Sequence, residues 1–199
     1  MRSTTNIPVI SIAYHTGYGH TGVLAEAVRD GAVRAGAVTH LIKVDEITHE
    51  QWSILDSSDA IIFGSPTYMG TASGAFHAFG EATSKRFISG QWHDKIAGGF
   101  TNSGSKSGDK LHTLQFFTVL AAQLGMVWVP LGLPPGWNTS QGSENDLNRL
   151  GFSLGAAAQS PADLGADAVH KADIATAEHL GHRIAHIAAT FVAGRTVAG

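Results

Sequence analysis

The segment 15–21 combines hydroxyl groups with glycines and reads His-Thr-Gly-Tyr-Gly-His-Thr. An apolar run precedes it and an amphipathic helical pattern follows it, so we expect the segment to join a buried strand to the start of a helix. The first N–H groups of a helix have no partner within the helix, and the helix dipole places partial positive charge there. This position therefore suits a phosphate group, although a tight turn without a ligand would show the same pattern.

Two known phosphate-binding motifs narrow this prediction. The segment lacks the Gly-Lys-Ser/Thr ending of the Walker motif, which argues against a nucleoside triphosphate site. Residues 17–22 match the Gly-x-Gly-x-x-Gly pattern of dinucleotide-binding folds, but no acidic residue closes the expected second strand, and Asp45 lies closest. The match is therefore weak evidence for a dinucleotide.

Two further segments are rich in small and polar residues. The segment 65–70 reads Ser-Pro-Thr-Tyr-Met-Gly and could place a flat ring against its backbone, with Tyr68 and Met69 as apolar neighbours. The segment 101–108 reads Thr-Asn-Ser-Gly-Ser-Lys-Ser-Gly, and Lys106 is the only cation in the three segments. Taken singly, these two segments also fit a proline-initiated turn and a polar loop before a helix.

Strand and helix patterns alternate along the chain and give all three segments comparable positions. Expected strands cover 7–14, 38–44, 59–64, 95–101 and 126–131, and helical patterns cover 23–34, 50–55, 73–87, 109–124 and 171–192. This alternation predicts an α/β fold with a doubly wound, five-stranded parallel sheet and helices on both faces. Ligands of such sheets bind beyond the carboxyl ends of the strands, and the three segments follow the first, third and fourth strands.

The composition fits one domain with few charges. The chain has 199 residues, a formal net charge of -3 and only 15% charged residues, where about 25% is usual. We expect residues 1–199 to form a single domain, with an irregular segment at 132–170 before the C-terminal helix. The balance of 13 basic and 16 acidic residues does not suggest a nucleic-acid-binding surface.

Residue types that are missing exclude several kinds of chemistry. The absence of cysteine excludes disulfides, thiolate nucleophiles and cysteine-ligated metals. The stretch Met1–Pro8 does not resemble a secretion signal, so we expect a cytoplasmic protein. The span 111–143 carries no Asp, Glu, Lys or Arg, but Gln, Gly and Pro interrupt it. It is therefore predicted to form a buried helix, a turn and a buried strand, without membrane insertion.

These features together resemble the WrbA-type family of NAD(P)H:quinone oxidoreductases, within the flavodoxin-like superfamily. The likeness spans roughly 7–132 and rests on residues 14–21 with their Tyr18-Gly19-His20 core, on 59–67, on Ser89-Gly90 followed by Lys95, on 102–108 and on 125–132. The motifs are spread over several expected strands, which favours a real relationship.

The resemblance implies a flavodoxin-like strand order of 2-1-3-4-5 and a single non-covalent FMN, with NADH or NADPH as co-substrate. Members of the family pass a hydride from the nicotinamide to flavin N5 and then to a quinone or similar acceptor. No catalytic side chain is expected, because the cofactor carries the redox chemistry. The resemblance also implies a homodimer or homotetramer, and no metal.

By position, the resemblance assigns the phosphate of FMN to the first segment and its isoalloxazine ring to the space between the other two. The implied cofactor-binding residues are His15, Thr16, Gly17, Tyr18, Gly19, His20, Thr21, Pro66, Thr67, Tyr68, Met69, Asn102, Ser103, Gly104, Ser105, Lys106 and Gly108. Tyr18 and Phe87 are the implied substrate-binding residues, since Phe87 stands where the family commonly has tryptophan. The chain departs from the family at Tyr68, where many members have arginine, and at 105–107, where Ser-Lys-Ser replaces glycines.

Two further hypotheses concern cations and histidines. If the Lys106 ammonium reached the N1/O2 edge of the flavin, it would stabilise the anionic reduced form, whereas a solvent-exposed loop lysine would not. His179, His182 and His186 recur at helical spacing, but no fourth ligand is near them in sequence. We therefore expect a solvent-facing or interface surface there rather than a metal site.

Two other functions remain open at this point. An electron-carrying flavodoxin usually docks through an acidic face, which 16 acidic against 13 basic residues do little to provide. A flavin-free regulatory or interaction protein is the third candidate. The uncharged span 111–143 favours a surface that is buried between subunits, so we expect the chain to form oligomers.

Overall fold

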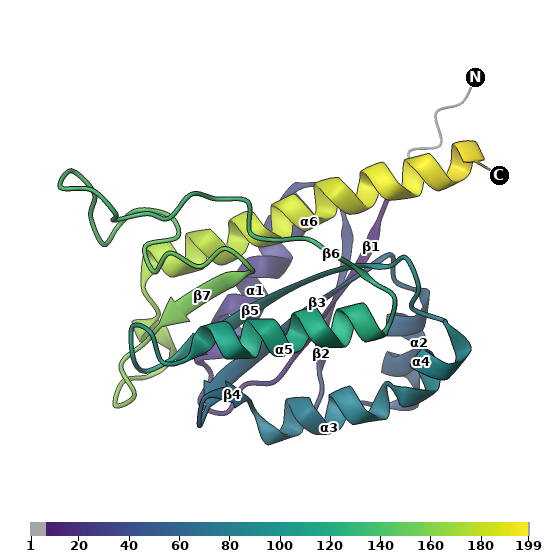
Figure 1. The fold of residues 1–199 in the computed structure, drawn as a ribbon, viewed down its shortest axis with the longest axis horizontal. Coiled ribbons are helices and arrows are strands. Elements are labelled where there is room, and N and C mark those ends of the chain that lie inside the picture. Colours follow the sequence, from purple (N-terminus) through teal and green to yellow (C-terminus); the bar gives the residue numbers. More distant parts are fainter. Residues whose placement is uncertain (1–6, 199) are drawn as a thin grey trace.

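The computed structural model describes residues 7–198, so the stretch Met1–Pro8, for which no secretion signal was expected, lies mostly outside the described part. Its central sheet contains the parallel strands β1 (Val9–Tyr14), β2 (Val38–Lys43), β3 (Ala60–Tyr68), β5 (Ile96–Ser103) and β6 (Val127–Trp128). Their order is β2-β1-β3-β5-β6 (Figure 1). The two-residue strand β4 (Thr71–Ala72) only folds back antiparallel on β3, so the predicted order 2-1-3-4-5 and the α/β fold are confirmed.

The fifth position of the sheet differs from the prediction. We expected one strand over 126–131, but β6 covers only Val127–Trp128 and pairs with the first two residues of β5. Pro130 has no N–H to continue the ladder, and Gly132 turns the chain with a φ of 71°. The chain therefore leaves the sheet after a short pairing.

The chain returns to the same edge within the segment 132–170, which we expected to be irregular. Strand β7 (Ala156–Gln159) pairs in parallel with Phe100–Ser103 at the carboxyl end of β5, and the short 3-10 helix η1 (Ala166–Ala168) follows it. The expectation of an irregular segment was thus wrong at these two places. The short strands β6 and β7 thus both pair with β5, at the edge of the sheet where the sequence predicted a single strand.

Helices cover both faces of the sheet (Figure 1). One face carries α1 (His20–Arg34) and α6 (Lys171–Ala198), and the other carries α2 (His49–Ser57), α3 (Gly74–Ala82), α4 (Ser84–Ser89) and α5 (Lys110–Gln123). Within residues 7–198, no helix has the length and apolar character needed to cross a membrane.

Close packing holds each helical layer on the sheet. A Cβ atom at Gly31 in α1 would overlap the Glu178 carbonyl, and one at Gly181 in α6 would overlap the Val28 carbonyl, so only glycine allows these two helices to approach so closely. On the other face, the ring centroid of Phe76 lies 4.8 Å from that of Phe117. Both cores are therefore densely filled, and they give the loops at the strand ends a rigid base.

The helix expected over 73–87 is interrupted. It divides at Thr83 into α3 and α4, and α6 extends beyond the expected end at Val192. The Thr83 hydroxyl donates a hydrogen bond of 2.6 Å to the Gly80 carbonyl and so competes with the helical hydrogen-bond pattern. A threonine at this position therefore ends the first helix.

Candidate functional site

A cleft of about 280 Å³ opens at the carboxyl ends of β1, β3 and β5. Its lining residues are Gly17, Tyr18, His20, Thr21, Pro66, Thr67, Tyr68, Asn102, Ser103, Gly104, Ser160 and Ala162. All but the last two come from the three segments that the sequence analysis selected. Among the described residues, no Asp, Glu, Lys or Arg belongs to this lining. The cleft therefore suits an anion or a neutral ring that binds through amides and hydroxyl groups.

The start of α1 forms one wall of the cleft. Gly19 precedes the helix with a φ of 90°, a conformation that favours glycine. As a glycine, Gly19 has no side chain to cap the helix, and the first turn of α1 carries no acidic residue. The Thr16 hydroxyl accepts a 3.2 Å hydrogen bond from the Gly22 N–H, which holds the loop against the helix. An anion at this end would meet the first amides of α1 and their partial positive charge.

Tyr18 of the first loop and Tyr68 of the second loop lie next to each other at the cleft. The rings of Tyr18 and Tyr68 are arranged edge to face, with centroids 6.4 Å apart. The Tyr68 hydroxyl lies so close to Gly17 that a Cβ atom there would overlap it. Burial and the neighbouring Tyr18 raise the pKa of Tyr68, so its phenol stays protonated at neutral pH and can donate a hydrogen bond.

The two histidines of the first loop have different surroundings. His20 Nε2 lies 3.0 Å from the Leu164 carbonyl oxygen, and because a carbonyl only accepts, this nitrogen carries the proton. The His20 ring thus joins the start of α1 to the segment after β7. His15 Nδ1 is buried and has no hydrogen-bond partner among the described residues, so it is a polar atom left for a bound group or a water molecule.

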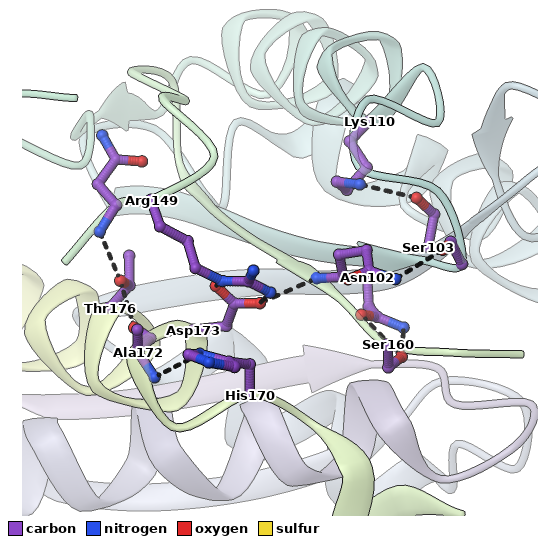
Figure 2. Close-up of polar contacts among 12 residues, drawn as sticks. Asn102, Ser103, Lys110, Arg149, Ser160, His170, Ala172, Asp173 and Thr176 are labelled. Carbon is purple, nitrogen blue, oxygen red and sulfur yellow. Dashed lines mark hydrogen bonds and ion pairs between the residues drawn. The ribbon is translucent and has the colours of Figure 1, made fainter. Parts of the chain in front are cut away.

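The segment after β7 holds the loop that follows β5. The side chains of Asn102 and Ser160 exchange hydrogen bonds of 2.8 and 3.2 Å (Figure 2). The Ser160 N–H donates to the Ser103 carbonyl at 3.2 Å, and Gln159 Nε2 donates to the Gly104 carbonyl at 2.9 Å. Strand β7 therefore positions the cleft wall that Asn102, Ser103 and Gly104 provide.

Lys110, the first residue of α5, reaches the same loop from the protein interior. The side chain is fully buried, and its Nζ donates to Ser103 Oγ at 2.8 Å (Figure 2). It also donates to the Ser105 carbonyl at 2.6 Å. Burial lowers the pKa of Lys110 to about 8, with Asp173 opposing this shift and Arg149 adding to it. A partly desolvated ammonium therefore lies directly behind the cleft wall.

Ser160, Ala162 and Lys110 were missed at the sequence level. The first two follow β7, whose weakly apolar run Ala-Ala-Ala-Gln was the one available signal for a strand. A lysine at the start of an amphipathic helix is typical of a solvent-exposed position, and only the tertiary structure shows that Lys110 is buried.

Several predicted site residues lie outside the cleft lining. They are His15, Thr16, Gly19, Met69, Ser105, Lys106, Gly108 and Phe87. Most of them belong to the loops and shape the backbone there, as Gly108 does with a φ of 55°. Lys106 is exposed, and its Nζ lies 5.2 Å from the centroid of the Trp137 ring. Phe87 lies on α4 and is 57% exposed, beside Arg86, which pairs with Asp56 in the last turn of α2.

The histidines of α6 form no metal site in the described structure. Within residues 7–198, no group of three or more His, Asp or Glu side chains could hold a metal ion. His179 Nε2 instead lies 3.2 Å from the Leu131 carbonyl oxygen and links α6 to the segment after β6.

The chain is similar to several known proteins. A family model described as NADPH-dependent FMN reductase matches residues 9–134. Flavodoxin FldP of Pseudomonas aeruginosa (strain UCBPP-PA14) is 42% identical over 179 residues, covering 88% of this chain and 94% of that protein. An NAD(P)H dehydrogenase (quinone) of Geotalea uraniireducens (strain Rf4) is 30% identical over 202 residues, covering 90% of this chain and 97% of that protein. The crystal structure of a flavodoxin, WrbA-like protein from Agrobacterium tumefaciens has a TM-score of 0.73 and 39% identity, covering 92% of this chain and 98% of that one.

Proposed function

The chain belongs to the NADPH-dependent FMN reductase family, and from this premise we propose that it is an FMN-dependent oxidoreductase that passes electrons from NAD(P)H to a quinone or similar flat acceptor. The observation that carries the proposal is the cleft at the carboxyl ends of β1, β3 and β5, where the start of α1 and two polar loops meet. This is the place where open parallel sheets bind their ligands.

The residues at the cleft fit FMN in three respects. The start of α1 offers amides and partial positive charge to a phosphate, with no acidic side chain in its first turn to repel it. Pro66 and Tyr68 provide flat, largely apolar walls for a ring, and Asn102 and Ser103 provide polar groups for its edge. The volume of about 280 Å³ is near the lower end of ordinary ligand pockets, which is consistent with a ring that stays partly accessible to a substrate.

When bound, FMN would supply the redox chemistry by taking a hydride at N5 and passing electrons to the acceptor. The residues of the chain would bind FMN and hold it in a fixed orientation. The helix start of α1 balances the charge of a phosphate, and the protonated Tyr68 phenol can donate a hydrogen bond beside it. Because the described lining contains no carboxylate, no side chain there opposes the negative charge that reduction adds.

An electron-carrying flavodoxin is the second candidate, and one observation favours it. The chain is 42% identical to flavodoxin FldP over most of both lengths. The acidic excess of the chain is small, with 16 acidic and 13 basic residues, which is unlike a carrier that docks through charge.

We also propose that the chain works as a homodimer or homotetramer. Phe87, the residue expected to contact substrate, lies away from the cleft of its own chain and is more than half exposed, as are Tyr18 at the cleft and Val119 on α5. A second copy that covered these side chains would bury exposed apolar surface, and Val119 belongs to the uncharged span 111–143. Sedimentation at micromolar concentration tests this, and a monomer would contradict it.

The visible spectrum of the purified protein with FMN tests the two flavin functions. An oxidoreductase would be yellow and would bleach when NADH or NADPH is added without air. A carrier would bind FMN and keep its colour in the presence of either nicotinamide. Failure to bind added FMN would contradict both functions and favour a flavin-free interaction protein.

A further inference from the structure

Lys110 is a buried cation without a carboxylate partner. Its Nζ has two hydrogen-bond acceptors, the Oγ of Ser103 at the end of β5 and the carbonyl of Ser105 in the loop that follows. The Phe152 ring lies on another side of the ammonium, with its centroid 5.9 Å from Nζ. Within residues 7–198, no acidic side chain forms an ion pair with Lys110. Burying an unpaired ammonium is unfavourable, so its retention calls for a reason besides stability.

The nearest carboxylate is already engaged. Asp173 on α6 forms a bidentate ion pair with Arg149, with distances of 2.8 and 2.7 Å, and both side chains are almost completely buried (Figure 2). Asp173 also accepts the Gln159 N–H at 3.0 Å. Asp173 and Arg149 are the charged groups that act on Lys110, and their charges oppose each other. The positive charge of Lys110 is therefore left largely uncompensated beside the cleft.

The hydrogen bonds of Lys110 also fix the direction of a peptide group. No cis peptide bond occurs among the described residues, and in a trans peptide the C=O and the following N–H point in opposite directions. Because the Ser105 carbonyl points to Lys110, the Lys106 N–H points away from the interior. The Ser103 carbonyl accepts a hydrogen bond from the Ser160 N–H, so the Gly104 N–H points away from the segment that follows β7. Two amides of this loop thus have defined directions before any ligand binds.

We propose that Lys110 is a positioning residue for bound FMN, which fixes the Ser103–Lys106 backbone from behind and stabilises the reduced flavin through its uncompensated charge. The inference rests on the proposed function, since it requires FMN in the cleft. Lys110 acts through Ser103 and the Ser105–Lys106 peptide and does not line the cleft itself. Reduction makes the flavin more negative, so a nearby buried cation strengthens the binding of reduced FMN more than that of oxidised FMN.

The test is the variant Lys110→Met, which keeps the side-chain length and removes both the charge and the donors. The dissociation constant of oxidised FMN is measured from its fluorescence. The midpoint potential of bound relative to free FMN then gives the ratio of the dissociation constants of the reduced and oxidised forms. We expect this ratio to rise about tenfold in Lys110→Met. An unchanged ratio would overturn the proposal.

A pH series separates the charge from the hydrogen bonds. Lys110 loses its proton as the pH rises through about 8, and a neutral amine can still donate to Ser103 and Ser105. Below pH 8, the ratio of the dissociation constants of reduced and oxidised FMN should therefore differ between wild type and Lys110→Met. Above pH 8, this difference should shrink. A difference that does not change between pH 6.5 and 9.5 would contradict the role of the charge.

Two further variants keep the test decisive. Lys95→Met removes another buried lysine, at the amino end of β5, and is expected to lower stability without changing the ratio. If Lys110→Met does not fold, Lys110→Arg takes its place in the test. Arginine stays charged at all these pH values, so the ratio of the dissociation constants of reduced and oxidised FMN should stay within about threefold of wild type. In this variant the ratio should no longer change with pH near 8. If the ratio in Lys110→Arg changed with pH as it does in wild type, the proposal would be overturned. Failure of the wild type to bind FMN would instead refute the proposed function, so the two failures are distinguishable.

Discussion

Buried lysines flank strand β5 at both ends, and their surroundings differ. At the amino end, Lys95 donates to the carbonyl groups of Asp56, at 2.9 Å, and of Ser58. Burial lowers the pKa of Lys95, but the carboxylates of Asp59 and Asp56 partly compensate its charge. At the carboxyl end, a single carboxylate among the described residues, that of Asp173, acts on Lys110, and the positive charge of its ion-pair partner Arg149 opposes it. Two carboxylates thus offset the charge of Lys95, whereas the charge of Lys110 is left largely uncompensated.

The same contrast extends to the side chains around each lysine. At the amino end, Asp56 accepts hydrogen bonds from Arg86, at 3.0 and 2.9 Å, and from Trp92 Nε1 at 2.8 Å. At the carboxyl end, glycines and hydroxyl groups surround an open cleft. We therefore expect substitutions at the amino end to change stability alone, and substitutions at the carboxyl end to change FMN binding more than stability.

The largest effect is expected for Trp92→Ala at the amino end. Trp92 is fully buried, so the substitution leaves a large cavity and removes the hydrogen bond to Asp56. It should lower the free energy of unfolding by about 4 kcal/mol. Urea denaturation measures this loss. The FMN dissociation constant of the folded variant should stay within about twofold of wild type, and a large change would mean that the two ends are not independent.

Asp56→Asn tests the charges of the amino end. Burial alone would raise the pKa of the Asp56 carboxyl, but hydrogen bonds from Arg86 and Trp92, and the charges of Arg86 and Lys95, outweigh it and keep the pKa below its usual value. A lowered pKa means that the ionised carboxylate stabilises the fold above the unfolded-state pKa of about 4, and that this contribution is lost as the pH falls through the folded-state pKa.

At pH 7 the loss in Asp56→Asn should therefore be about 2 kcal/mol, the usual range for hydrogen bonds to a charged group. Urea denaturation at a series of pH values should show the stabilities of wild type and variant converging as the pH falls below the unfolded-state pKa of about 4 and through the lowered folded-state pKa. A constant gap down to pH 2 would show that the charge of Asp56 contributes nothing and that only its shape matters.

At the carboxyl end, Gly17→Ala is expected to weaken FMN binding about tenfold, or about 1.4 kcal/mol. The new Cβ would overlap the Tyr68 hydroxyl and displace that ring from the first loop. Stability should fall by less than about 1 kcal/mol, because the end of a partly exposed side chain can move. Gly74→Ala is the matched control, since nothing lies within 4 Å of its Cβ position. Equal FMN affinities in the two variants would contradict the role of Tyr68 at the cleft.

The sequence predicted where the loops of the candidate site meet better than it predicted the groups behind them. Three loops at the ends of expected parallel strands had to meet at one edge, and 17–21, 66–68 and 102–104 do so. Strand β7 was missed because Ala-Ala-Ala-Gln has little hydrophobic contrast, and its pairing with β5 is a long-range contact. Lys110 was missed for a related reason. Burial of a lysine depends on which distant segments cover it, and the local helical pattern carries no such information.

The smallest effect is expected for Lys106→Ala, although Lys106 was the cation that the sequence analysis singled out. The structure exposes Lys106 and places its Nζ 5.2 Å from the Trp137 ring centroid, an arrangement that contributes less than about 1 kcal/mol when exposed. The variant keeps the backbone amide, which is the group that Lys110 orients. The ratio of the dissociation constants of reduced and oxidised FMN should therefore change less than threefold, against about tenfold for Lys110→Met. If potentiometry showed a larger change for Lys106→Ala than for Lys110→Met, the exposed ammonium would be the group that tunes the flavin. The difference between the lysines at the two ends of β5 would then have no bearing on FMN binding.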